Sequence, residues 1–135
     1  MARVATLLVA DEVYFNLSGK TILQGIYHAD LVIPTDESRA PQLIFFFIAE
    51  TDQSDAFQSL IAEVTLPGSS PVSQPVQLIW PLPQTAKGTR AFYKHPLLIQ
   101  NPILRPGRII AKLLHEGGGE ILVGAPNILK AAATN

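Results

Sequence analysis

The chain has 135 residues, of which 47% are hydrophobic and 16% are charged, and its formal net charge is −1. It contains no cysteine, which excludes a disulfide framework, a thiolate nucleophile and a cysteine-ligated zinc site. The near-zero net charge supplies no field that would attract nucleic acid or an anionic membrane, so we expect neither as a partner.

The first ten residues are mostly apolar, but Asp11 and Glu12 interrupt this run and no cleavage-site pattern follows. We interpret the run as a first strand and not as a signal sequence. No segment approaches the roughly 18 apolar residues that a membrane-spanning helix needs. We therefore expect a cytoplasmic protein.

A hairpin is predicted over residues 10–27, where apolar and β-favouring residues flank a polar turn at 16–20. Its two strands are expected at 4–17 and 21–33. Residues 34–41 are polar and bounded by prolines, which predicts a loop.

Two residues interrupt the regular pattern of these strands. Asp11 falls on the apolar, odd-numbered face of the first strand. Either Asp11 is buried and hydrogen-bonded, or a bulge at 10–11 places it in solvent, which is the alternative we favour. Gly25 predicts a second bulge or a close approach of the backbone.

Residues 43–49 have the sequence Leu-Ile-Phe-Phe-Phe-Ile-Ala, which is apolar without alternation. This pattern predicts a strand that is covered on both faces. Residues 56–66 fit both a helix and a strand, and the stop at Pro67-Gly68 leads us to choose a strand.

The rest of the chain is expected to be loop and strand. Five of the eleven prolines lie between residues 67 and 83, which predicts a loop and then an edge strand at 76–82. The expected elements after it are a strand at 89–99, with Ala91, Tyr93, His95 and Leu97 on one face, and a hairpin of 108–116 and 120–124 turning through Gly117-Gly118-Gly119.

About eight short strands separated by turn residues predict an all-β fold, as an antiparallel β-sandwich of two sheets. We expect a single domain over residues 1–130 and a frayed tail at 131–135.

Two motifs stand out, one near each end of the chain. The first is an apolar strand ending in Ala10-Asp11, the turn Gly19-Lys20-Thr21 and the strand Leu23-Gln24-Gly25-Ile26-Tyr27; the second is Leu104-Arg105-Pro106-Gly107 with the hairpin from Leu113 to Ile121. Together they resemble a bacterial family known only as a domain of unknown function. The resemblance implies a small β-sandwich with no catalytic residues to carry over. The structural candidates are Asp11, Gly19, Gly25 and Gly107.

Few residues are candidates for metal binding or catalysis. His28, His95 and His115 are far apart in the sequence and lack ligand spacing such as His-x-His, so we expect no metal site unless the fold makes them converge. Asp11 and Glu12 are adjacent and point to opposite faces of a regular strand, which disfavours a catalytic pair of carboxylates. We predict no catalytic residues and no cofactor.

The low charge and the two-sided strand at 43–49 lead to the hypothesis of a non-enzymatic binding or assembly module that forms homo-oligomers, with a further protein partner possible. One alternative is a ligand-binding sandwich of the carbohydrate type, with Tyr27, Trp80 or Tyr93 as stacking surface. The other is a small metal-dependent enzyme.

Overall fold

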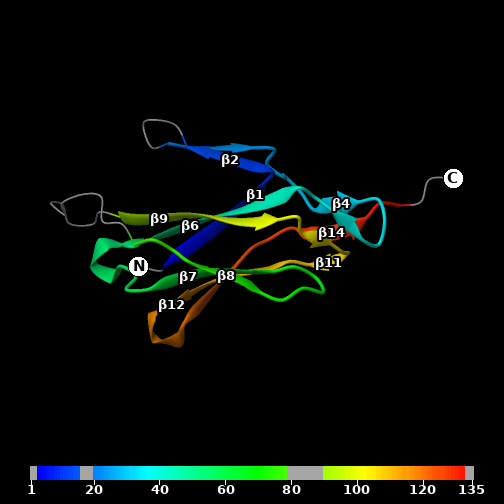
Figure 1. The fold of residues 1–135 in the computed structure, drawn as a ribbon. Coiled ribbons are helices and arrows are strands. Elements are labelled where there is room, and N and C mark those ends of the chain that lie inside the picture. Colours follow the sequence, from blue (N-terminus) through cyan, green and yellow to red (C-terminus); the bar gives the residue numbers. More distant parts are fainter. Residues whose placement is uncertain (1–2, 16–19, 79–89, 133–135) are drawn as a thin grey trace.

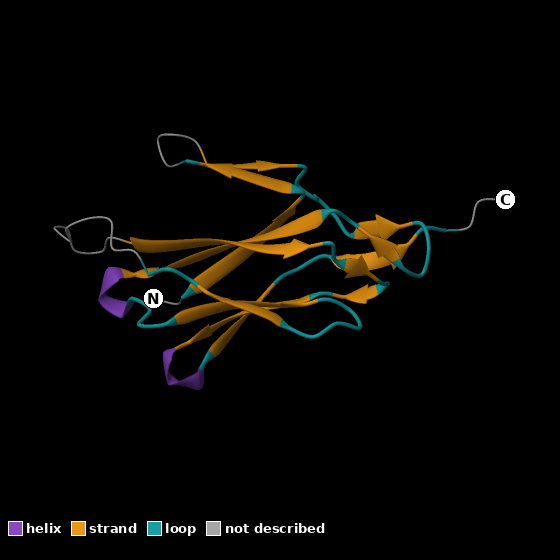
Figure 2. Ribbon diagram, viewed as in Figure 1, coloured by secondary structure: helices purple, strands orange, loops and turns teal. Residues whose placement is uncertain are grey.

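The computed structural model describes residues 3–15, 20–78 and 90–132, and this part of the chain is built from strands (Figures 1 and 2). The all-β prediction is confirmed, because the described residues form fourteen strands, two single turns of 3₁₀ helix and no α-helix. The elements are β1 (Val4–Ala10), β2 (Glu12–Phe15), β3 (Thr21–Gln24), β4 (Leu31–Ile33), β5 (Ser38–Arg39), β6 (Gln42–Asp52), η1 (Gln53–Asp55), β7 (Leu60–Thr65), β8 (Val72–Pro75), β9 (Arg90–Gln100), β10 (Ile103–Leu104), β11 (Gly107–Arg108), β12 (Ile110–His115), η2 (Glu116–Gly118), β13 (Glu120–Val123) and β14 (Asn127–Lys130).

The described strands form five sheets, where the sequence predicts about eight strands in two. The two larger sheets have the strand orders β1-β6-β9 and β13-β12-β7-β8. A third has the order β11-β14-β4, and the pairs β2–β3 and β5–β10 are the remaining two. The pairs are antiparallel except for β4 and β14, which run parallel.

Strands are more numerous than expected for two reasons. The interruptions at Asp11 and Gly25 divide the first two predicted strands into four, and the strand predicted at 108–116 is divided into β11 and β12. In addition, the short strands β5, β10 and β14 form where none was predicted. Of these, β5 corrects the prediction that residues 34–41 are loop throughout.

The two larger sheets share one hydrophobic core. Alternate residues of β6 face this core, and Leu43, Phe45 and Phe47 are 0%, 0% and 1% exposed. Residues of the four-stranded sheet complete it: Leu60, Ala62 and Val64 of β7, Ala111 and Leu113 of β12, and Val123 of β13. Burial of this apolar surface is the main contribution to the stability of the folded state.

The central strand β6 is also covered on its second face, as its unbroken apolar sequence predicts. Ile44 and Phe46 point away from the core and are nevertheless 1% and 4% exposed. The hairpin β2–β3, which we call the arm, contacts β6 and is seen as a separate layer beside β1 and β6 in Figure 1. The arm therefore covers part of the outer face of the sheet β1-β6-β9.

Several local predictions are confirmed and two are corrected. Residues 60–65 form strand β7, and β12 pairs with β13 in the expected second hairpin. Of the edge strand predicted at 76–82, residues 76–78 are not in a strand and residues 79–82 are outside the described range. The structure instead has β8, at Val72–Pro75, as an edge strand of the four-stranded sheet. The backbone N–H of Ala131 donates to the carbonyl of Ile33 at 2.7 Å, so ordered pairing extends one residue into the predicted tail.

Candidate functional site

Asp11 lies at the joint where the chain leaves the sheet for the arm. Its backbone N–H donates to the carbonyl oxygens of Gln24 at 3.1 Å and Gly25 at 3.3 Å, and the N–H of Tyr27 donates to the carbonyl of Val9 at 2.9 Å. The Asp11 side chain is exposed, as the favoured alternative expected, but the bulge that this alternative invoked is not present. The strand ends here, instead of continuing through a one-residue bulge.

Gly25 and Tyr27 complete this joint. Gly25 has a φ of +73°, and a Cβ atom on it would lie 2.5 Å from Oδ2 of Asp11. The hydroxyl of Tyr27 donates to Oδ1 of Asp11 at 2.7 Å. Burial, together with this hydrogen bond and the carboxylate charge, raises the pKa of Tyr27 to about 12. Tyr27 therefore stabilises the base of the arm, whereas the sequence suggested it only as a surface on which a ligand could stack.

Tyr93 is a core residue and not an exposed aromatic. It is 4% exposed, and its hydroxyl accepts a hydrogen bond from the backbone N–H of Phe57 at 3.2 Å. The two rings pack edge to face with centroids 5.2 Å apart. The prediction that Tyr93 offers a stacking surface is wrong, because its face of β9 points into the core. The other predicted aromatic, Trp80, lies outside the described residues, as does Gly19.

Gly107 lies close against the loop that follows β7. Its φ is +149°, and a Cβ atom there would lie 2.9 Å from Cβ of Pro67. A side chain at this position would therefore collide with the loop that follows β7.

The three histidines lie on different elements. His28 is in the loop between β3 and β4, His95 is in β9, and His115 ends β12. Burial lowers the pKa of His95, and Nε2 of this ring lies 2.8 Å from Oε1 of Gln74. Within the described ranges, no three histidine, aspartate or glutamate side chains are grouped as a metal site requires.

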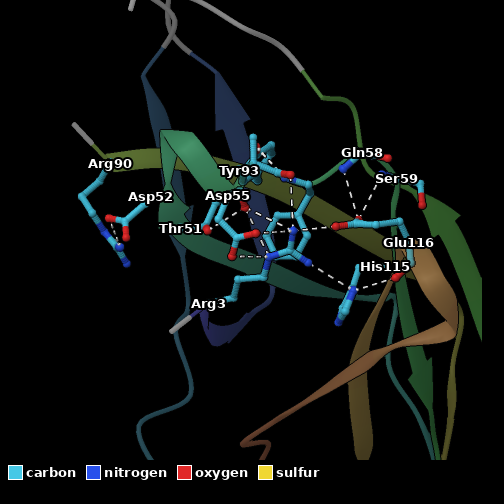
Figure 3. A network of polar contacts seen from close by, with 12 residues as sticks. Arg3, Thr51, Asp52, Asp55, Gln58, Ser59, Arg90, Tyr93, His115 and Glu116 are labelled. Carbon is cyan, nitrogen blue, oxygen red and sulfur yellow. Dashed lines mark hydrogen bonds and ion pairs between the residues drawn. The ribbon is translucent and has the colours of Figure 1, made fainter. Parts of the chain in front are cut away.

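A polar cluster around Arg3 links the start of β1 to both 3₁₀ turns (Figure 3). Its guanidinium pairs with Oε1 of Glu116 at 2.5 Å and with Oδ2 of Asp55 at 3.2 Å. The same group lies 4.3 Å from the ring centroid of Phe57, and Nη1 is 3.2 Å from Nδ1 of His115. One cation therefore joins segments that are more than a hundred residues apart in the chain.

Glu116 is the anionic centre of this cluster. Its Oε2 accepts hydrogen bonds from the backbone N–H groups of Gln58 at 3.1 Å and Ser59 at 3.5 Å. Burial alone would raise the pKa of this carboxyl, but the hydrogen bonds from Arg3 and from backbone N–H groups outweigh it and lower the pKa to about 2. A carboxylate that binds protons so weakly is a poor general base, so the cluster is suited to anchoring and not to proton transfer.

The Glu116 cluster predicts a specific dependence of stability on pH. Because the folded-state pKa of Glu116 is depressed to about 2, its contribution is present above the unfolded pKa near 4.5 and is lost as pH falls toward 2. We expect Glu116→Gln to unfold more easily than the wild type at pH 7 and to show a smaller fall in unfolding free energy between pH 5 and pH 2. Urea denaturation across this pH range measures the unfolding free energy of both proteins. If the two free energies fell in parallel with pH, the role assigned to Glu116 would be contradicted.

A groove of about 530 Å³ separates the arm from the outer face of the sheet β1-β6-β9. Its lining combines apolar side chains with two cations: Leu8, Phe46, Ile48 and Lys94 from the sheet, and Lys20, Thr21, Leu23 and Ile26 from the arm and its flanking residues. None of the predicted candidate site residues among the described residues lines this groove. Most of the lining residues belong to stretches that the sequence analysis described for their structure, namely the first motif and the apolar run at 43–49. Those patterns predicted a hairpin and a covered strand, but they did not show that the two enclose a groove.

The outer faces of both larger sheets combine charged and apolar side chains. On the four-stranded sheet, Nζ of Lys112 lies 3.4 Å from Glu63 and 3.3 Å from Glu120. The exposed apolar residues on the same face are Ile61, Ile110 and Leu122. On β9 of the other sheet, Phe92 and Leu98 share the outer face and are 57% and 37% exposed. The sheet β1-β6-β9 therefore has an apolar outer face that the arm covers only in part.

No protein-family model matches the chain, and no curated protein and no solved structure matches it. The family resemblance of its two motifs stays a prediction. Across the described residues, no helix combines the length and apolar character needed to cross a membrane.

Proposed function

We propose that this protein is a non-enzymatic assembly module that forms a homo-oligomer through the outer face of the sheet β1-β6-β9. In this proposal the two larger sheets are the layers of a β-sandwich. The observation that supports it is the stripe of apolar side chains Phe92, Pro96 and Leu98 on the outer face of β9, which is interrupted only by Lys94 and continues the arm-covered surface into solvent. An antiparallel sheet that faces water on one side normally alternates apolar and polar residues, and this one does not.

A second copy of the chain is a suitable cover for this stripe. The formal net charge of −1 produces little repulsion between copies. On the outer face of the four-stranded sheet, the ion pairs of Lys112 with Glu63 and Glu120 separate the exposed apolar side chains. The stripe on β9 instead adjoins the apolar surface of β6 that the arm already covers, so we place the contact on β9. Two-fold pairing of such stripes would place identical apolar residues against each other.

The test replaces Phe92 with lysine. We expect the wild type to be oligomeric at micromolar concentration and Phe92→Lys to weaken association by at least about thirtyfold, the effect of removing a hot spot of about 2 kcal/mol. Light scattering coupled to size-exclusion chromatography measures the mass. A lysine at 92 lies opposite Glu50 in the β6–β9 register, so the substitution is compatible with the fold.

Leu122 provides the matched control, because it is 72% exposed on β13 of the other sheet. Leu122→Lys should keep the wild-type mass. A monomeric wild type, or equal dissociation by the two variants, would reject the proposal.

A further inference from the structure

We infer that the groove between the arm and the sheet β1-β6-β9 binds a free long-chain carboxylate, the chemistry of a fatty acid. This site adjoins the proposed oligomer contact, because Lys94 lies between Phe92 and Pro96 on the outer face of β9. The inference does not require that the protein forms an oligomer. The volume of about 530 Å³ falls within the range of roughly 300–1,000 Å³ that small-molecule sites occupy.

The charge of the groove selects an anion. The charged side chains among its described lining residues are Lys20 and Lys94, with no carboxylate between them. Lys94 is exposed, and no described residue forms an ion pair or hydrogen bond with it. The hydroxyl of Thr21 adds a donor on the arm side. An entering carboxylate would thus meet the ammonium group of Lys94 and the hydroxyl of Thr21, and no described lining residue carries a carboxylate that would repel it.

The remaining lining selects an apolar chain without amide groups. Leu8, Phe46 and Ile48 face Leu23 and Ile26 across the groove, so both walls present hydrocarbon. Each wall is the face of a sheet, which presents side chains, because the backbone N–H and carbonyl groups of strands point sideways in the plane of the sheet. A peptide would bury an N–H and a carbonyl per residue with no partner here, and each such unsatisfied group is costly. An acyl chain has none to satisfy.

The site also explains why the arm is separate from the sheet. The arm is attached by the joint at Asp11, and its inner face carries Phe15, which is 61% exposed. A side chain of this size next to Thr21 in the β2–β3 register gives further apolar contact to a ligand that extends beyond the groove. Burial of the acyl chain against both walls supplies the affinity, and Lys94 orients the carboxylate.

The experiment titrates the whole protein with dodecanoate below its micellar concentration, using calorimetry for affinity and amide NMR shifts for location. We expect saturable binding and shifts centred on Thr21, Leu23, Ile48 and Lys94. Lys94→Gln should weaken binding about tenfold, the effect of losing one charge-assisted hydrogen bond. Lys130→Gln removes a lysine that instead pairs with Asp36 at 3.1 Å, and it should bind as the wild type does.

Two further probes identify the ligand class. Dodecanol should bind more weakly than dodecanoate, and a hydrophobic pentapeptide with a free carboxyl end should bind more weakly still. The inference is overturned by shifts outside the groove, by equal affinity of the two lysine variants, by tighter binding of dodecanol or of the peptide, or by binding to phosphatidylglycerol vesicles alone. Absence of dodecanoate binding up to its solubility limit also overturns it, whatever the oligomeric state.

Discussion

Replacing Arg3 with methionine is expected to lower the free energy of unfolding by about 2–4 kcal/mol, because it leaves the partly buried carboxylate of Glu116 without its cation. The side chains of Arg3 and Glu116 are 16% and 27% exposed, so water compensates only partly for the loss. Methionine keeps an unbranched apolar stem but removes the guanidinium, and with it the cation–π contact with Phe57, the ion pairs and the hydrogen bonds to the Asp55 and Ala56 carbonyls. Denaturant unfolding at pH 7 measures the change.

A surface pair serves as the control for this prediction. Arg105 pairs with Glu37 at 3.1 Å, but these side chains are 38% and 58% exposed. Arg105→Met should therefore cost less than about 1 kcal/mol. If the two arginine variants lost equal stability, the Arg3 cluster would not be the anchor that its geometry indicates.

The sequence predicted those parts of the fold that depend on local pattern. The unbroken apolar run at 43–49 identified β6 as covered on both faces, and alternation at 89–99 placed Tyr93 and Leu97 on one side of β9. Glycine and proline marked the ends of the hairpin β12–β13. These features are local because side-chain direction alternates along a strand whatever its partner is.

The Arg3 cluster could not be predicted in the same way. Arg3 was visible as a lone charge in an apolar segment, but its partner Glu116 is separated from it by 113 positions. Which charges meet depends on how β1 lies relative to the hairpin β12–β13, and no local pattern encodes that. The misjudged Tyr93 has the same origin, since its aromatic ring suits both a binding surface and a core.

The groove exists because the chain leaves the sheet β1-β6-β9 at Asp11 and forms the arm between Asp11 and Gly25. The sequence predicted interruptions at these two residues but not the change of sheet. Asp11 and Gly25 were recognised as interruptions, yet a bulge and a change of sheet leave the same mark in the sequence. The structure shows that the interruption moves β2 and β3 out of the sheet β1-β6-β9 and into a separate layer. The cover of β6 and the groove beside it both follow from that change.

Replacing Gly25 with alanine is expected to destabilise the protein by about 1–3 kcal/mol and to loosen the arm. The φ of +73° disfavours any side chain, and the added Cβ would lie 2.5 Å from Oδ2 of Asp11. Asp11 cannot move away freely, because its other oxygen accepts the Tyr27 hydroxyl at 2.7 Å. Hydrogen exchange should show reduced protection of the β2 and β3 amides while the β12 amides keep theirs, and denaturant unfolding measures the loss of stability.

Gly117 separates the two causes of this effect. Its φ of +76° matches that of Gly25, but no atom lies within 4 Å of the position that its Cβ would take. Gly117→Ala therefore reports the backbone strain alone, about 1–2 kcal/mol, and the excess loss in Gly25→Ala reports the collision with Asp11. Adding Asp11→Gly to Gly25→Ala should remove the collision and restore part of the arm protection. Equal losses in the two alanine variants, with the arm protected in both, would show that the joint tolerates a side chain and that Asp11 does not position the arm.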